Sequence, residues 1–210
     1  MTIRRLEEQV CRLKEPVCQN HEAVVIGVSA GGMKALEILF SRLKKDCNLA
    51  FIVVQHVSPG SDEFFVRYLN ERSVLTVKQA DEKETIKKGY VYIAPPDYHL
   101  LIEEDRTFSL SVDEKVNYAR PCIDITFETA AFAFDSSLIG IVLTGANRDG
   151  SQGLKKIKEK GGIAIVQDPK TAEVPVMPRE AIHRVKVDHI LSLEEIAVFL
   201  NNYCRTPDKG

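Results

Sequence analysis

Long apolar runs are missing from this sequence of 210 residues. No stretch reaches the roughly 18 uninterrupted apolar residues that a membrane-spanning helix needs, and the opening segment, residues 1–14, mixes charged and apolar side chains, unlike a secretory signal. A large excess of one charge is also missing, because 28 basic and 30 acidic residues leave a net charge of -2. The sequence therefore predicts a cytoplasmic protein that is not inserted in a membrane and has no basic surface for nucleic acid.

Cysteine is sparse and scattered along the chain. A structural zinc site or a disulfide framework needs closely grouped cysteines or histidines, and no CxxC pair or histidine cluster is present. We therefore expect reduced thiols and no bound metal. The five cysteines are Cys11, Cys18, Cys47, Cys122 and Cys204.

Apolar strands alternate with amphipathic helices from Ala23 onward. This alternation is typical of an α/β fold with a doubly wound, mainly parallel sheet and helices on both faces. Short β-prone runs over residues 89–112 break the rhythm and predict a small antiparallel hairpin excursion, and a loop is expected through Pro178. The predicted strands are 23–28, 49–55, 73–78, 138–143 and 162–166, and the predicted helices are 32–44, 61–70, 122–134, 151–160 and 193–203.

The N-terminal segment is predicted to be separate from this domain. Apolar residues recur at three- and four-residue spacing over residues 2–14, which predicts an amphipathic helix. Pro16 interrupts the pattern, so we divide the chain into a helix and linker over residues 1–22 and a single domain over residues 23–204. The apolar stripe of the helix either packs back on the domain or binds a signalling partner or a second copy of the chain.

Residues 27–31 read GVSAG, a G-x-S-x-G motif that follows a β-branched strand and precedes a helix. In this context the serine, Ser29, stands on a tight turn with its hydroxyl exposed, which is the position of a nucleophile. The N–H groups of Ala30 and Gly31 begin the helix and can bind an oxyanion. The alternative is a phosphate-binding turn, but the dinucleotide fingerprint requires glycine at the Ser29 position and no P-loop ending follows. We therefore predict no cofactor.

A serine hydroxyl needs a base, and His56 is the best placed of the five histidines. It ends the predicted strand 49–55, and neighbouring parallel strands end at the same edge of a sheet. Asp149, in the loop after strand 138–143, is predicted to orient the imidazole. The alternatives are a solvent-exposed His56 at a strand end and an Asp149 that caps helix 151–160. The chain order Ser, His, Asp differs from the Ser, Asp, His of α/β-hydrolases, which argues against that fold.

Six segments of the chain together resemble one known family, the chemotaxis protein-glutamate methylesterases, in their catalytic domain. The resemblance runs from about Ala23 to Phe199 and assigns the family's triad to Ser29, His56 and Asp149. The six segments are VVIGVSAGG at 24–32, IVVQHVSP at 52–59, YIAPPDYHL at 92–100, RPCIDITFETAA at 120–131, IVLTGANRDGSQGL at 141–154 and QDPKTAEVPVMPREA at 167–181.

The resemblance implies a serine esterase that acts on methylated chemoreceptors. The substrates would be γ-glutamyl methyl esters on the cytoplasmic helices of the receptors, hydrolysed to glutamate and methanol through an acyl-serine. Some members also deamidate receptor glutamines. The alternative is a non-catalytic signalling or adaptor module that keeps the fold.

The resemblance also implies further site residues and one architectural difference. The family usually has methionine, lining the oxyanion site, where this chain has Ala146, so backbone donation is kept while side-chain packing changes. Arg120, Met177 and Pro178 lie in family-typical runs and are candidates for substrate contact. Many members carry an N-terminal receiver domain, and the roughly 20 residues before the first strand are too few for one, so we expect a stand-alone catalytic domain without phosphorylation control in cis.

Overall fold

The computed structural model describes residues 21–56, 62–116 and 118–203. The predicted helix over residues 2–14 lies outside the described residues, so its packing and its partner stay predictions. None of the helices in the described part of the chain has the length and apolar character needed to cross a lipid bilayer.

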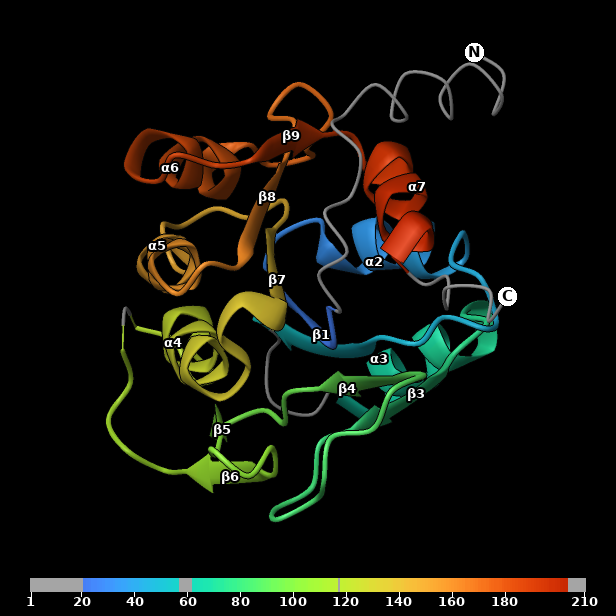
Figure 1. Cartoon of the computed structure of the whole chain (residues 1–210), viewed down its shortest axis with the longest axis vertical. Coiled ribbons are helices and arrows are strands. Elements are labelled where there is room, and N and C mark those ends of the chain that lie inside the picture. The colour runs from blue at the N-terminus through green and yellow to red at the C-terminus, as the bar shows by residue number, and fades with distance from the viewer. Residues whose placement is uncertain (1–20, 57–61, 117, 204–210) are drawn as a thin grey trace.

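Seven parallel strands form the central sheet (Figure 1). The central strand β1 (Ala23–Val28) is buried along its whole length. It pairs with β2 (Ala50–Gln55) on one side and β7 (Leu138–Val142) on the other, so that Gly27 lies opposite Val54 and Val142. The carboxyl ends of these three strands therefore lie side by side at one edge. In spatial order the strands are β3 (Thr76–Gln79), β4 (Tyr90–Ile93), β2 (Ala50–Gln55), β1 (Ala23–Val28), β7 (Leu138–Val142), β8 (Ile163–Gln167) and β9 (His189–Leu191).

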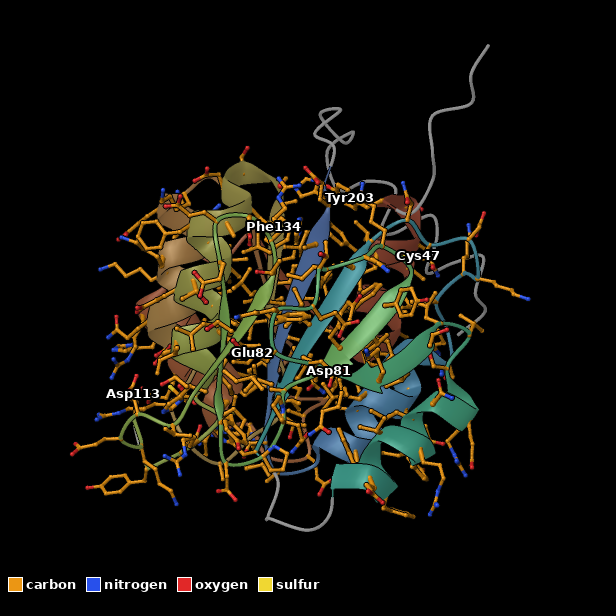
Figure 2. All side chains as sticks on the ribbon, turned by 90° about the horizontal axis from the view of Figure 1, so that it is seen from below. Cys47, Asp81, Glu82, Asp113, Phe134 and Tyr203 are labelled. Carbon is orange, nitrogen blue, oxygen red and sulfur yellow. The ribbon has the colours of Figure 1, made fainter. Side chains whose placement is uncertain are left out.

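Helices cover both faces of this sheet. Successive β1 side chains enter different apolar clusters, since Val24 and Ile26 belong to one cluster and Val25 belongs to the other. Figure 2 shows the strands between two helical layers. The predicted doubly wound architecture is confirmed. One layer contains α2 (Gly32–Phe40), α3 (Asp62–Arg72) and α7 (Leu193–Tyr203), and the other contains α4 (Ile123–Phe134), with the short 3-10 helix η1 (Asp135–Ser137) after it, α5 (Ser151–Glu159) and α6 (Val176–Arg184).

The antiparallel excursion is shorter than the sequence predicts. Residues 99–102 and 108–111 form the antiparallel pair β5 (His99–Ile102) and β6 (Phe108–Ser111). The preceding run is different, because β4 joins the main sheet in parallel with β2 and β3. Its residues Val91, Tyr92 and Ile93 are buried, as expected of an internal parallel strand. From the sequence alone, residues 90–93 resemble a hairpin strand, because the run is short and β-prone and two prolines follow it.

The predicted loop through Pro178 is instead a helix. Pro178 is the third residue of α6, where a missing N–H group costs no hydrogen bond because the first turn of a helix has unpaired donors. The proline therefore lies at the start of a helix and does not mark a loop.

Cysteine pairing also differs from the expectation at one position. Cys47 is disulfide-bonded, whereas Cys122 is a free and buried thiol. The distance between cysteines along a chain does not determine which thiols meet in the fold, so the scattered pattern did not predict this bond.

Candidate active site

Three loops meet at the carboxyl edge of β1, β2 and β7. The Ser29 N–H donates to the Thr144 carbonyl at 3.0 Å, and the His56 N–H donates to the Val28 carbonyl at 3.2 Å. The Gln55 side-chain amide donates to the carbonyls of both Ser29 and His56, each at 3.0 Å. These bonds fix the loop after each strand to its neighbour and hold Ser29 and His56 at one edge of the sheet.

Ser29 lies on a sharp turn between β1 and α2. Gly31 caps α2 with a φ of +80°, a left-handed conformation that glycine adopts without steric cost. Gly145, in the loop after β7, lies directly against this turn. A Cβ at Gly145 would be 3.0 Å from the Cβ of Ser29 and would collide with the sulfur of Met177. The two loops can approach this closely because position 145 has no side chain.

Ser29 and His56 line the same cavity, which has a volume of about 420 Å³. Gly31, Lys34 and Glu173 also line it. Because the wall carries one charge of each sign, it does not strongly favour an anion or a cation. An uncharged ester or amide group suits such a cavity.

His56 and Asp149 form a hydrogen-bonded pair. His56 Nε2 lies 3.0 Å from Asp149 Oδ2, and the Asp149 side chain is fully buried. Burial raises the pKa of Asp149, but hydrogen bonds from His56 and from the N–H groups of Ile123 and Asp124 outweigh burial and hold the pKa below its ordinary value. Asp149 is therefore a carboxylate, which can only accept, so His56 Nε2 carries the donated proton. This is the geometry that orients a catalytic imidazole.

Asp149 does not cap the helix that follows it. Gly150 occupies the N-cap position of α5 and makes no side-chain cap bond. The two Asp149 oxygens instead accept from the first two N–H groups of α4, at 2.7 and 3.0 Å. Asp124, in the first turn of α4, accepts in turn from two N–H groups of α5, at 2.9 and 2.8 Å. Asp149, just before α5, thus caps α4, and Asp124, in the first turn of α4, caps α5.

The raised pKa of Asp124 should make the free energy of unfolding depend on pH. Burial and the neighbouring Asp149 carboxylate raise the pKa of Asp124 from its ordinary value of 3.8 to about 6. Between these two values the folded protein binds a proton that the unfolded chain does not, so this group adds stability as the pH falls from 7 to 5. The Asp124→Asn variant keeps an acceptor for α5 without the charge and should lose this pH dependence.

Urea unfolding of wild type and Asp124→Asn at pH 5 and pH 7 measures the effect. The free energy of unfolding of the wild type, relative to the variant, should be larger at pH 5 than at pH 7. Burial lowers the pKa of His189, which acts in the opposite direction, but it acts equally in both proteins and cancels in the comparison. A difference that does not change with pH would contradict the assignment.

Asn147 contacts the pair and was not identified from the sequence. Its Nδ2 lies 3.1 Å from His56 Nδ1, and its Oδ1 accepts the Asp149 N–H at 3.1 Å. Asparagine often bonds to the backbone two residues ahead in this way, so the local turn has a sequence signal. The contact with His56 has none, because the two residues are 91 positions apart.

The candidate oxyanion donors occupy two of the loops. Ala30 and Gly31 line the cavity beside Ser29. Ala146 is exposed and follows Gly145, the residue that lies against the Ser29 turn. The structure therefore places all three backbone positions near the serine.

The candidate substrate contacts lie outside the wall of this cavity. Met177 and Pro178 are buried in α6, and the Met177 N–H donates to the Gly145 carbonyl at 3.0 Å. Arg120 Nη1 donates to the carbonyls of Val112 and Asp113, at 2.7 and 3.0 Å. Met177 thus lies behind the Ser29 turn, and Arg120 is bonded to the loop after β6.

His99, in β5, is not available as a base for Ser29. His99 is buried, with Nε2 3.1 Å from the Glu114 carbonyl and Nδ1 accepting the Cys122 N–H at 3.3 Å, so both ring nitrogens serve the packing. Among residues 21–56, 62–116 and 118–203, no three His, Cys, Asp or Glu side chains are grouped to hold a metal ion.

Comparison with known proteins gives a consistent family assignment. A sequence profile described as CheB methylesterase matches residues 24–200. A Leptospira interrogans protein, provisionally named protein-glutamate methylesterase/protein-glutamine glutaminase, is 54% identical over 178 residues, which cover 85% of this chain and 92% of that protein. A Pyrococcus horikoshii protein with that name is 36% identical over 197 residues, covering 92% of this chain and 54% of that protein.

The fold has a close counterpart among solved structures. The crystal structure of the Thermotoga maritima CheB methylesterase catalytic domain is similar with a TM-score of 0.84 and 36% sequence identity, and the similarity covers 88% of this chain and 99% of that chain.

Proposed function

Because this chain belongs to the CheB methylesterase family, we propose that it is a protein-glutamate methylesterase in which Ser29 is the nucleophile, His56 the general base and Asp149 the group that orients His56. The observation that carries the proposal is that the histidine lining a cavity with Ser29 is hydrogen-bonded to a fully buried carboxylate. Burying an ionised carboxylate costs free energy unless the carboxylate is hydrogen-bonded to a partner, as Asp149 is to His56.

The first half of the reaction forms an acyl-enzyme. As the Ser29 oxygen attacks the ester carbonyl, His56 Nδ1 takes the hydroxyl proton, since Nε2 is engaged with Asp149. Collapse of the tetrahedral intermediate expels methoxide, which receives that proton from His56 and leaves as methanol. The glutamyl group is then esterified to Ser29.

The second half regenerates the serine. His56 takes a proton from a water molecule as the water attacks the acyl carbonyl, and the proton passes to the Ser29 oxygen as glutamate is released. In both halves the N–H groups of Ala30, Gly31 and Ala146 are the candidate donors to the developing oxyanion. One such donor is worth about 3 kcal/mol in a transition state.

The proposed substrates are methylated glutamates on the cytoplasmic helices of chemoreceptors, which places the enzyme in the cytoplasm. The names of the Leptospira and Pyrococcus relatives also include protein-glutamine glutaminase. Deamidation would use the same acyl-serine, with ammonia leaving in place of methanol. Recruitment of a signalling partner or a second copy through residues 2–14 stays part of the proposal.

Two measurements on the wild type test this function. Incubation with a receptor cytoplasmic fragment carrying radiolabelled methyl esters should release labelled methanol, and a fluorophosphonate probe should give an adduct that peptide mass spectrometry locates on Ser29. A protein that releases no methanol and takes up no probe would instead be a non-catalytic adaptor with the same fold.

A further inference from the structure

The hydrogen bonds around His56 determine which atom of each bonded pair is the donor. The Asp149 N–H can only donate, so the Asn147 atom facing it at 3.1 Å is the amide oxygen. The amino group of Asn147 therefore faces His56 Nδ1 at 3.1 Å. Because an amino group can only donate, Nδ1 presents its lone pair to Asn147 and the ring proton is on Nε2.

Asn147 is not needed to select this form of the ring. Asp149 accepts the Nε2 proton at 3.0 Å, and a carboxylate that can only accept is sufficient to hold the proton there. The contribution of Asn147 is different, because its side-chain –NH₂ group donates a hydrogen bond to the lone pair of Nδ1. This is the lone pair that must take the Ser29 proton.

We propose that Asn147 is a positioning residue that latches His56 in a resting state and must withdraw from Nδ1 before Ser29 can be acylated. The inference rests on the proposed function, because it requires His56 to be the base for Ser29. The latch makes acylation slower than the triad alone would allow.

The surroundings of Asn147 leave room for this withdrawal. Asn147 is partly buried and its neighbours Ala146 and Arg148 are exposed. Asn147 also borders a second cavity, of about 460 Å³, with Tyr118, Arg148 and Val176. The side chain can therefore leave His56 without displacing a packed core residue.

Two substitutions at this position should have opposite effects. Asn147→Ser keeps a short acceptor for the Asp149 N–H, but its hydroxyl is one bond closer to the backbone than Asn147 Nδ2 and should not reach His56 Nδ1. The rate constant for fluorophosphonate labelling of Ser29 should therefore rise about fivefold, the worth of one neutral hydrogen bond. Asn147→Asp keeps the acceptor for Asp149 but presents only oxygens to Nδ1. A proton is then held on that nitrogen between two carboxylates, and labelling should be slower by about tenfold or more.

Nitrogen-15 NMR of the imidazole supplies a readout that a merely structural role would not change. In the wild type, His56 Nε2 should carry the proton and Nδ1 should show the shift of a hydrogen-bonded acceptor. In Asn147→Ser, Nδ1 should move toward the shift of an unbonded nitrogen, while Nε2 stays protonated. A wild-type ring with its proton on Nδ1 would overturn the proposal.

A control one position away separates the latch from general disturbance of the loop. Arg148→Ser changes an exposed side chain and should leave the labelling rate within about twofold of the wild type. A labelled wild type whose Asn147→Ser variant is no faster would overturn the latch alone. A wild type that is not labelled at Ser29 would overturn the proposed function, and the latch with it.

Discussion

The Ser29→Ala variant is expected to release methanol from methylated receptor about five orders of magnitude more slowly than the wild type. Without the side-chain oxygen no acyl-enzyme can form, and only the backbone donors and substrate binding remain to assist direct attack by water. Single-turnover methanol release at saturating enzyme measures this loss without interference from product release.

The same substitution should leave the fold intact. The interactions that hold residue 29 are made by its backbone, through the Thr144 carbonyl, the Gly32 N–H and the Gln55 amide, and alanine retains all of them. The melting temperature should therefore stay within about 2 °C of the wild type. Ser41→Ala, which removes an exposed hydroxyl bonded to the Ile38 carbonyl, is a matched control that should keep full activity. Normal turnover by Ser29→Ala would exclude Ser29 as the nucleophile.

The Asp149→Asn variant should lose both activity and stability. Both carboxylate oxygens accept hydrogen bonds, Oδ2 from Ile123 and His56 and Oδ1 from Asp124 and Gly150. In either orientation an amide –NH₂ group faces N–H donors, and this conflict should cost about 2–4 kcal/mol of the free energy of unfolding. Turnover should fall by about four orders of magnitude, because the imidazole loses the acceptor that sets its tautomer.

Urea unfolding and methanol release must be measured on the same preparation of this variant. Activity is compared only under conditions in which unfolding shows the variant to be fully folded, so that a loss of turnover is not a loss of folded protein. Reduced stability with unchanged turnover would make Asp149 a helix cap with no part in orienting His56.

Residues at strand ends were the most predictable part of the site. Ser29 and His56 each follow a strand that is apolar throughout, and such strands must lie inside a parallel sheet, where their carboxyl ends share an edge. The sequence therefore predicts that Ser29 and His56 meet, and the shared cavity agrees. Strand β4 was harder, because a run between a glycine-containing turn and two prolines is compatible with both a hairpin and an internal strand.

The contact of His56 with Asp149 was predicted although the two residues are 93 positions apart, but other contacts between side chains distant in the sequence were not. Asp149 caps α4, whose first residue is 26 positions away, and the local pattern favoured the adjacent helix α5 instead. The Asn147 contact with His56 depends on how two loops pack. Propensity and periodicity describe what a segment does alone, whereas these bonds depend on where two segments meet.

Because Asp149 caps α4 and Asp124 caps α5, the starts of these two helices should unfold together on heating. If the first turn of α4 frays, Asp149 loses two of its donors and no longer holds the imidazole in place, and the start of α5 loses its own cap at the same time. Proteins open in cooperative units, and here one unit contains both helix starts and the aligned histidine. Esterase activity and the order of the first turns of α4 and α5 should therefore be lost over the same temperature range.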